Sequence, residues 1–419
     1  MARIALVNIG MHGHVNPTLG FIKELTRRGH EVYFFCTDEF GPMIARTGAK
    51  FISYPSLLGQ SLARSAQLQA EATAEGKAPP GSTMAVFLEE FGSTFPKLYE
   101  HLLAMKPDFI IYDFISLATR IIAQHLDIQT IQFFTTYASN EHYNLVKETF
   151  AKHDFPMEEQ IQAAQNFIDG VSAKFGCQST SIRTAFEYTN HDNLVFMPRD
   201  FQPSGQTFDE RFNFVGPCVR AAHSEEAMSL IPDGDGPIMI ISLGSLFHEW
   251  PEFYSSCIEA FGHTPWRIVM GIGTKLKPET LGPIPANFRV LAHIPQIELL
   301  QYADLFISHG GMNSTMEALS LGVPLVVIPQ MEEQELTAQQ VDALGLGRFL
   351  PRAEVNVDSL AAAISYAVTP AVRANLDTMQ EALRVAGGID RAVAVIEAAP
   401  RPSVTPGNFV NLTRTPAPR

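Results

Sequence analysis

The stretch Leu305–Glu317, LFISHGGMNSTME, decides how the rest of this 419-residue chain is interpreted. Its first residues, Leu305–Ile307, form a short apolar run that predicts a buried strand. A pair of glycines ends the strand, and Asn313 or Ser314 can then cap a helix that continues beyond the stretch. A strand, glycines and a helix N-terminus together predict an anion-binding site, because free backbone N–H groups and the helix dipole both favour negative charge there.

Polar residues on either side make this turn more specific than a glycine-rich turn alone. Ile294-Pro295-Gln296 precedes it, Gly322-Val323-Pro324 follows its helix, and Glu333-Gln334 comes one strand later. Together with His309 and Glu317, this pattern resembles the donor-binding signature of the UDP-glycosyltransferases, and of their bacterial macrolide/flavonoid-type branch in particular. That signature has an aromatic residue, then Gln, then His-x-Gly-x-x-Ser-x-x-Glu, then Gly-Val-Pro, then an acidic residue followed by Gln.

The resemblance implies a contact for each part of a UDP-sugar donor. Uracil would lie at His293, where the family often has a Trp, and at the backbone of Ile294. Gln296 would hold the ribose-uracil end, Glu317 would accept from the ribose hydroxyls, and Glu333 and Gln334 would contact the sugar hydroxyls. The diphosphate would lie on the glycine turn and the helix after it, at His309, Gly311, Met312, Asn313 and Ser314.

The bulk properties restrict the partners and the compartment. A net charge of −14 argues against a nucleic acid or an anionic membrane as partner, so local dipoles must hold a diphosphate. The four cysteines have no paired spacing and are interpreted as reduced apolar residues. Since neither a signal peptide nor an apolar run of membrane-spanning length is evident, we expect a cytoplasmic protein, and either a monomer or a weak dimer.

Alternation of short apolar runs with helical segments predicts the fold, which is two doubly wound, Rossmann-like α/β domains with parallel sheets. The resemblance adds that they face one another across a cleft, the GT-B arrangement. We place an acceptor-binding domain at 1–218, a linker at 219–236, a nucleotide-sugar-binding domain with C-terminal helices at 237–398 and a disordered tail at 399–419. The expected strands are Arg3–Ile9, Glu31–Cys36, Phe51–Tyr54, Phe109–Tyr112 and Thr130–Phe133, then Ile238–Ile241, Ile268–Met270, Arg289–Ala292, Leu305–Ile307 and Leu325–Ile328.

His14 and Asp113 are the candidate catalytic residues. His14 follows the first strand and Asp113 the fourth, which are neighbours in a sheet of order 3-2-1-4-5, where ligands bind at the carboxyl ends. A carboxylate fixes the tautomer of an imidazole and stabilises its protonated form, as a general base requires. The helix expected to open with Asn16 as cap and Pro17 at its first position would oppose this, because its dipole favours the neutral ring. Which effect dominates stays open.

Three further sets of residues complete the prediction. Ser245 ends the first strand of the second domain and is expected near the diphosphate by the same rule. Asp233 and Asp235 have the spacing with which other glycosyltransferases hold manganese, but they lie in the linker, so we expect no metal site and no cofactor beyond the UDP-sugar co-substrate. Aromatic residues after strand ends are expected to line an apolar acceptor pocket, with Phe87 as a weaker candidate: Phe87, Phe114, Phe134 and Tyr137.

The resemblance therefore implies an inverting transfer of a hexose, with UDP-glucose as the expected donor, to a hydroxyl of a hydrophobic small molecule such as a flavonoid, another phenol or a macrolide. Two alternatives stay open. One is a UDP-sugar epimerase on the same fold, which would use the donor alone. The other is a ligand-binding module without catalysis, which the presence of both His14 and Asp113 disfavours.

Overall fold

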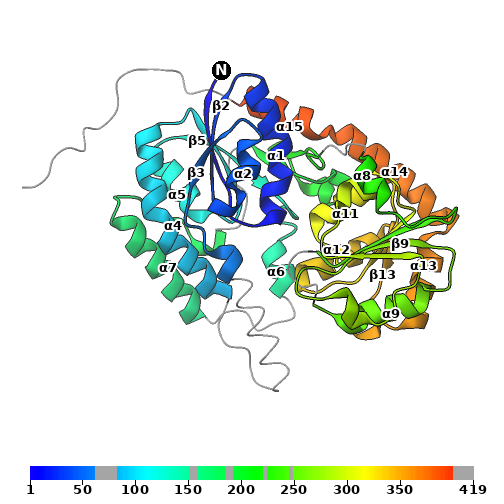
Figure 1. Ribbon diagram of the computed structural model, residues 1–419. Helices are drawn as coiled ribbons and strands as arrows, with labels where there is room; N and C mark the ends of the chain where they lie inside the picture. Colours follow the sequence, from blue (N-terminus) through cyan, green and yellow to red (C-terminus); the bar gives the residue numbers. More distant parts are fainter. Residues whose placement is uncertain (62–82, 151–157, 185–191, 220–223, 245–248, 400–419) are drawn as a thin grey trace, which may run out of the picture.

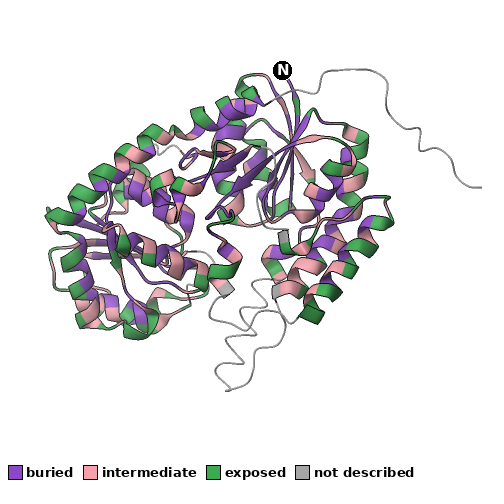
Figure 2. Ribbon diagram, turned by 180° about the vertical axis from the view of Figure 1, so that it is seen from behind, coloured by how far each residue is buried: buried purple, intermediate pink, exposed green. Residues whose placement is uncertain are grey.

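The structure, a computed structural model, describes residues 1–61, 83–150, 158–184, 192–219, 224–244 and 249–399 (Figure 1). It consists of two α/β domains, each built on a sheet in which every strand pair is parallel. The predicted fold class is thereby confirmed. The central strands are buried and the outer faces of the flanking helices are exposed (Figure 2), so each sheet forms the centre of its domain.

The first domain holds a sheet of seven strands in the order β3-β2-β1-β4-β5-β6-β7. The first strand pairs on one side with β2 and on the other with β4, which is the reversal of strand order predicted from the sequence. The strands are β1 Arg3–Val7, β2 Glu31–Cys36, β3 Lys50–Ser53, β4 Phe109–Asp113, β5 Gln129–Phe134, β6 Asn193–Val195 and β7 Phe212–Phe214.

The second domain repeats this plan with six strands in the order β10-β9-β8-β11-β12-β13. Its reversal point lies between β8 and β11, where Ser308 pairs with Ser242. The strands are β8 Ile238–Ser242, β9 Arg267–Gly271, β10 Phe288–Leu291, β11 Leu305–Ser308, β12 Leu325–Val327 and β13 Gly347–Phe349.

Helices cover both faces of each sheet, as parallel strands require. In the first domain they are α1 His12–Arg27, α2 Gly41–Ala45, α4 Thr83–Met105, α5 Leu117–His125, α6 Leu145–Phe150 and α7 Glu158–Ala173. In the rest of the chain they are α8 Glu225–Ser229, α9 Pro251–Phe261, α10 Gln296–Leu300, α11 Met312–Ser320, α12 Glu332–Ala343, α13 Val357–Ala367, α14 Pro370–Ala386 and α15 Gly388–Ala398.

Helix α1 begins earlier than the sequence predicted. It starts at His12 with Met11 as N-cap, so Asn16 is not the cap and Pro17 lies inside the helix. Proline has no N–H, and the carbonyl four residues before it therefore loses its helical partner. That carbonyl belongs to Gly13, and it accepts a hydrogen bond from Nδ2 of Asn313 at 2.7 Å instead. The proline thus frees a backbone acceptor at the boundary between the domains.

Helix α15 returns to the first domain, although its residues follow the second domain in the chain. Ile389, Val393 and Ile396 belong to the same buried cluster as Phe21 of α1, and Figure 1 shows α15 beside α1. The close approach needs Gly20, because a Cβ there would lie 2.2 Å from the carbonyl oxygen of Cys218. The grouping of residues 388–398 with the second domain did not anticipate this packing.

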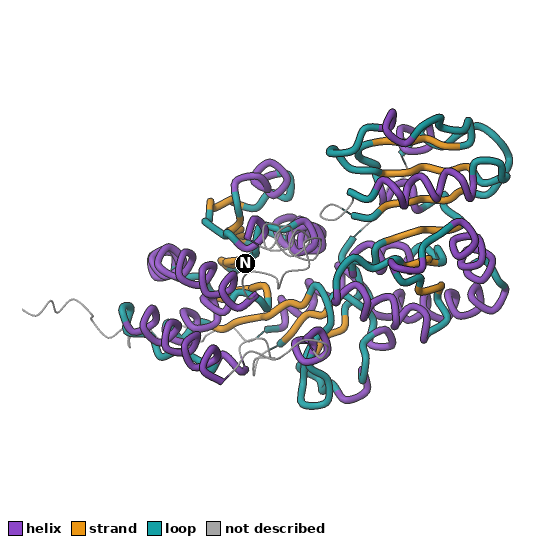
Figure 3. Tube along the Cα trace, turned by 90° about the horizontal axis from the view of Figure 1, so that it is seen from below, coloured by secondary structure: helices purple, strands orange, loops and turns teal. Residues whose placement is uncertain are grey.

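The two domains have separate sheets, but their side chains share one hydrophobic cluster. Figure 3 shows the two sets of strands lying apart, with helices between them. Tyr137 and Phe201 of the first domain lie in the same cluster as Met312 and Leu299 of the second. A side-chain donor also crosses the boundary, since Gln340 Nε2 donates to the carbonyl of Phe201 at 3.0 Å. The site described next lies at this boundary.

Candidate active site

His14 and Asp113 are in direct contact, as the strand order predicted. Nδ1 of His14 lies 2.6 Å from Oδ2 of Asp113, whose side chain has no exposed surface. The other carboxylate oxygen accepts from the backbone N–H of Ile115 at 3.0 Å. Both oxygens of Asp113 are therefore occupied, which fixes the carboxylate. A carboxylate that accepts from Nδ1–H leaves Nε2 as the basic nitrogen of the ring.

The pKa of His14 is raised above its ordinary value of 6.5. Burial is the largest influence and lowers it, but the charge of Asp113, the hydrogen bond to Asp113 and the charge of Glu333 together outweigh burial. The carboxylate of Asp113 thus outweighs burial at His14, while the opposing effect of the helix dipole stays open. The ring lies within the first turn of α1, where Asn8 Nδ2 also donates to the backbone carbonyl of His14 at 2.9 Å.

Thr135 is a contact that the sequence analysis missed. It follows β5, the strand next to β4, and its Oγ1 lies 3.1 Å from Nδ1 of His14. Three adjacent strands, β1, β4 and β5, therefore deliver His14, Asp113 and Thr135 to one point. The rule that located the first two residues applies equally to the strand after them, so the signal was present in the sequence.

The N-terminus of α11 faces this point from the second domain. Gly311 is its N-cap and makes no side-chain cap, so the cap expected at Asn313 or Ser314 is wrong by two or three residues. The first N–H groups of the helix have no intrahelical acceptor and are available to an anion. The bond from Asn313 to the carbonyl of Gly13 brings this helix end next to the first turn of α1. Met312 is buried, so only its backbone can serve a ligand.

His309 follows β11 and is held between two glycines. A Cβ on Gly311 would lie 2.5 Å from Nε2 of His309, and a Cβ on Gly244 would lie 2.6 Å from the same atom. Gly244 also has φ of +80°, a conformation that favours glycine. Burial lowers the pKa of His309 to about 4, so the ring is neutral near pH 7. Its Nδ1 has no hydrogen-bond partner among the described residues.

Gln296, Ser314 and Glu317 form one hydrogen-bonded group. Nε2 of Gln296 donates to Oγ of Ser314 at 3.0 Å and to Oε2 of Glu317 at 2.8 Å. Burial raises the pKa of Glu317 to about 7, although the bond from Gln296 opposes the rise. The structure thus joins Gln296 and Glu317, which the family resemblance assigns to the ribose end of the donor, to Ser314, which it assigns to the diphosphate.

Glu333 and Gln334 open α12 after β12. The charge of Glu333 raises the pKa of His14 and of Tyr143, so its carboxylate lies close enough to the first domain to act on both residues. Gln334 is buried, and its Oε1 accepts from the backbone N–H of Gln330 at 2.8 Å. This bond fixes the amide and leaves Nε2 as the group that can donate to a ligand.

The remaining donor candidates lie at the edge of the second sheet. His293 is exposed, as a residue that stacks on a base would be, and Ile294 packs against Gly271 of β9. Ser245 lies outside the residues that the structure describes. The roles of all these residues in binding stay predictions.

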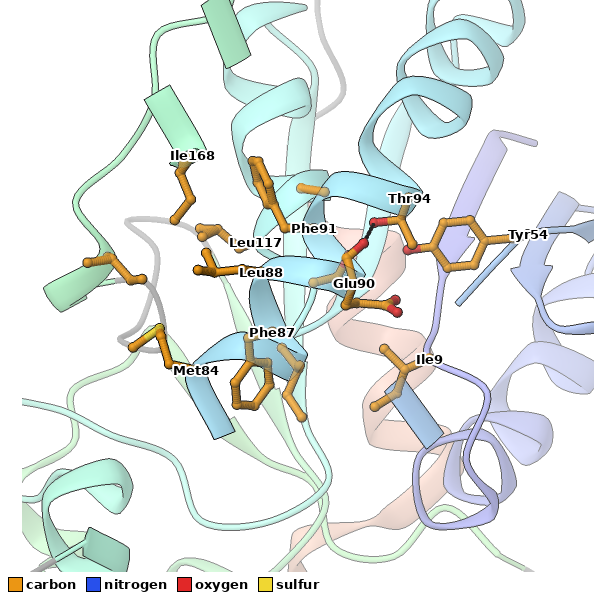
Figure 4. Close-up of a pocket in the computed structure, with 14 residues that line it drawn as sticks. Ile9, Tyr54, Met84, Phe87, Leu88, Glu90, Phe91, Thr94, Leu117 and Ile168 are labelled. Carbon is orange, nitrogen blue, oxygen red and sulfur yellow. Dashed lines mark hydrogen bonds between the residues drawn. The ribbon is translucent and has the colours of Figure 1, made fainter. Parts of the chain in front are cut away.

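The four aromatic candidates divide into two groups. Phe87 lines a cavity of the first domain with Ile9 and Ile115 (Figure 4). Phe114, Phe134 and Tyr137 are buried in the cluster shared by the domains and do not line that cavity. Phe114 still stacks beside the ring of His14, with centroids 6.5 Å apart. Phe87, the weakest candidate in the sequence, is therefore the one that the cavity exposes.

Within the described ranges, no group of three His, Cys, Asp or Glu side chains could hold a metal ion. Asp233 and Asp235 are exposed there, in the segment between the domains. Across the same described residues, no helix is long and apolar enough to cross a membrane.

Comparison with known proteins agrees with this geometry. The C-terminal domain of the erythromycin biosynthesis protein CIII-like family matches residues 256–386. The chain is 41% identical over 406 residues to the NDP-glycosyltransferase YjiC of Bacillus subtilis (strain 168), covering 96% of this chain and 98% of the relative. It is 33% identical over 405 residues to demethyllactenocin mycarosyltransferase of Streptomyces fradiae, covering 95% and 86% of the two chains.

A solved structure shares the whole architecture. The crystal structure of CalG4, the calicheamicin glycosyltransferase, matches with a TM-score of 0.79 at 32% identity, and covers 95% of this chain and 98% of its own. Since these similarities extend over nearly the full length of each partner, the chain belongs to the bacterial NDP-glycosyltransferases, the YjiC-like members of the macrolide glycosyltransferase family with the GT-B fold.

Proposed function

We propose that this enzyme transfers glucose from UDP-glucose to a hydroxyl group of a hydrophobic small molecule, with inversion at the anomeric carbon. The observation that carries the proposal is the contact of 2.6 Å between His14 and Asp113, next to the helix N-terminus that the bond from Asn313 to Gly13 brings to the same point. The base lies on the first-domain side of the boundary between the domains, and the anion-binding helix end lies on the second-domain side. This arrangement suits the attack of a hydroxyl on a sugar whose leaving group is a diphosphate. Because the chain belongs to the glycosyltransferases, the epimerase and the binding module are set aside.

The base chemistry follows from the hydrogen bonds of His14. Asp113 holds the proton of Nδ1, so Nε2 accepts the proton of the acceptor hydroxyl. The hydroxyl oxygen then forms a bond to the anomeric carbon while the bond from that carbon to the diphosphate oxygen breaks. The electron pair of the broken bond leaves with UDP, and inversion follows because the nucleophile and the leaving group lie on opposite faces. The charge of Asp113 stabilises the imidazolium that results.

The leaving group is stabilised by dipoles in the second domain. The free N–H groups at the start of α11, the hydroxyl of Ser314 and the neutral ring of His309 can all donate to diphosphate oxygens. Donors that are fixed before the reaction need no reorganisation as charge develops. We assign the ribose to Gln296 and Glu317, which are already bonded to one another.

We assign the sugar to residues at the start of α12 and the acceptor to residues of the first domain. Glu333 lies close enough to the first domain for its charge to act on His14, and a carboxylate there can accept from two neighbouring sugar hydroxyls while Nε2 of Gln334 donates to one. This set suits glucose. The relatives include proteins named for lactenocin, oleandomycin and calicheamicin, which supports a large hydrophobic natural product or phenol as acceptor. Phe87 and the cavity it lines would receive that acceptor.

The test is a transfer assay with UDP-glucose, with and without a phenolic acceptor, in which UDP release and the anomeric configuration of the product are both measured. The assay is run in the presence of EDTA, since the proposal uses no metal. His14→Ala should lower kcat by at least about a hundredfold and leave the affinity for UDP unchanged, because general base catalysis contributes about 10²–10⁴-fold.

His12→Ala is the matched control. His12 lies in the same helical turn, is exposed and contacts the ring of Phe40 rather than Asp113, so this variant should keep wild-type kcat. A His14→Ala enzyme with more than about a tenth of wild-type activity would overturn the assignment of the base. UDP release that needs no acceptor, or a product with retained configuration, would overturn the proposed reaction.

A further inference from the structure

The backbone around His14 is held by two asparagine side chains, one from each domain. Nδ2 of Asn8 donates to the carbonyl of His14 at 2.9 Å, and Nδ2 of Asn313 donates to the carbonyl of Gly13 at 2.7 Å. Asn8 follows β1 and is fully buried, so its amide belongs to the rigid part of the first domain. Asn313 is the second residue of α11, so its amide belongs to the anion-binding helix end of the second domain.

The peptide group between Gly13 and His14 has a hydrogen bond at each end. The N–H of His14 donates to the carbonyl of Met11 at 2.9 Å, within the first turn of α1. In an uninterrupted helix the carbonyl of Gly13 would accept from the N–H of residue 17, but Pro17 has none. Asn313 supplies the missing donor from the other domain. The orientation of this peptide group therefore depends on a contact that crosses the boundary.

The side chain and the backbone of Asn313 have different surroundings. The side-chain nitrogen is bonded to the first domain, whereas the family resemblance implies a contact with the diphosphate. The backbone N–H lies in the first turn of α11, among the groups that have no intrahelical acceptor and can serve an anion. Helices α1 and α11 contact one another at this point (Figure 1). One residue thus connects the anion-binding helix end to the turn that carries the proposed base.

We propose that Asn313 is a positioning residue for the transfer: its side-chain amide sets the distance between His14 and the sugar by bonding the carbonyl of Gly13, and this amide is not a diphosphate ligand. The inference rests on the proposed function, in which His14 is the base and α11 holds the diphosphate. The anomeric carbon is attached to the diphosphate, so its place follows α11, whereas the place of the His14 ring follows α1. A hydroxyl between them reacts only when the reacting atoms are close and aligned. The bond from Asn313 joins the two first turns and fixes that approach.

Asn313→Ala removes the side-chain amide and keeps the backbone N–H. In transfer from UDP-glucose its kcat should fall by about tenfold or more, because a misplacement of about 1 Å can cost about 10²-fold in rate. Its affinity for UDP, measured by calorimetry, should stay at the wild-type value, which also shows that the variant is folded. A diphosphate ligand would give weaker UDP binding instead. Weaker UDP binding with unchanged kcat would therefore overturn the inference.

Pro17→Ala tests the same bond from the acceptor side. Residues 12–27 are helical, so an alanine at position 17 offers its N–H to the carbonyl of Gly13, which then no longer depends on Asn313. In this background Asn313→Ala should lower kcat much less than in the wild-type enzyme, and a double-mutant cycle measures the difference. An equal loss of kcat in both backgrounds would show that Asn313 does not act through this carbonyl, and would overturn the inference.

Gln340→Ala is the matched control. Nε2 of Gln340 donates to the backbone carbonyl of Phe201 at 3.0 Å, which is another bond from a side-chain amide to a carbonyl across the boundary. Phe201 lies in the short helix Arg199–Phe201, away from the three strand ends that deliver His14, Asp113 and Thr135. This variant should keep the wild-type kcat. A loss as large as that of Asn313→Ala would mean that any weakening of the boundary slows transfer, and would overturn the role assigned to Asn313.

His14→Ala, assayed under the same conditions, separates the inference from the proposed function. If the wild-type enzyme transfers no glucose, or if His14→Ala keeps the wild-type rate, the proposed function fails and the inference fails with it. If His14→Ala is inactive and Asn313→Ala keeps the wild-type kcat, only the inference fails.

Discussion

Replacing Asp113 by asparagine tests how His14, the proposed base, is held. The side chain is fully buried, and its two oxygens make different bonds, one from Ile115 N–H at 3.0 Å and one with His14 Nδ1 at 2.6 Å. An asparagine keeps the first bond if its oxygen lies towards Ile115. Its N–H₂ group then lies towards His14 and can only donate, so Nδ1 must become the acceptor and the proton moves to Nε2. The ring is then the wrong tautomer to act as a base.

The magnitude follows from these contacts. A hydrogen bond to a charged group contributes about 1.5–3 kcal/mol, which is about 10- to 150-fold in rate. Loss of the correct tautomer removes the general base as well, so we expect kcat to fall by about 10²–10⁴ in total. Asp113→Asn should not alter the affinity for UDP, because the diphosphate seat belongs to α11.

The pH profile gives a second readout. In the wild-type enzyme the pKa of His14 is raised, so kcat falls as the pH drops through a value above 6.5. Without the charge at position 113, burial becomes the dominant influence on His14 and lowers its pKa, and the acid limb of kcat moves to lower pH. The assay is UDP release across pH, with UDP affinity by calorimetry. A variant with unchanged kcat, or with an acid limb at higher pH, would refute this account of the pair.

Three further predictions concern the donor. Gly311→Ala should weaken UDP binding by about tenfold or more in calorimetry, because its Cβ would lie 2.5 Å from Nε2 of His309; Gly170→Ala, where nothing lies within 4 Å, is the control. UDP affinity should fall as the pH drops through about 7, where protonation of Glu317 removes an acceptor for ribose hydroxyls; an affinity that is flat from about pH 6 to 8 would contradict this assignment. UDP-glucose should give a higher kcat/KM than UDP-galactose and UDP-glucuronate, and Glu333→Gln should narrow the margin; equal turnover of glucose and galactose would show that the start of α12 does not read the sugar.

The contact between His14 and Asp113 and the glycine turn before α11 could be predicted because they depend on topology and on short local patterns. Parallel strands with a reversed order bring the ends of β1 and β4 together, whatever the side chains elsewhere. The same reasoning extends to β5, so Thr135 was within reach of the sequence. Glycines at 310 and 311 and a helix after them predict an anion-binding site without knowledge of any distant contact.

Other features could not be predicted because they depend on contacts between distant parts of the chain. Pro17 is typical of the first position of a helix, and only the packing of α1 against the second domain explains its place inside the helix. Phe114, Phe134 and Tyr137 were expected at an acceptor pocket because they follow strand ends, but the sequence holds no sign that the two domains share a hydrophobic cluster there. Local patterns do not record which buried surface an aromatic side chain contacts.

The return of α15 to the first domain has a consequence for folding during synthesis. Residues 388–398 complete the core around α1, and Ile389, Val393 and Ile396 lie there with side chains from the beginning of the chain. When only residues 1–218 have been synthesised, the helix α1 beside the first sheet therefore still exposes an apolar face. Domains usually fold in the order in which they are made, but here the first domain gains its last packing contacts only after the second has been synthesised. The nascent chain thus carries that apolar face through the synthesis of about 170 further residues.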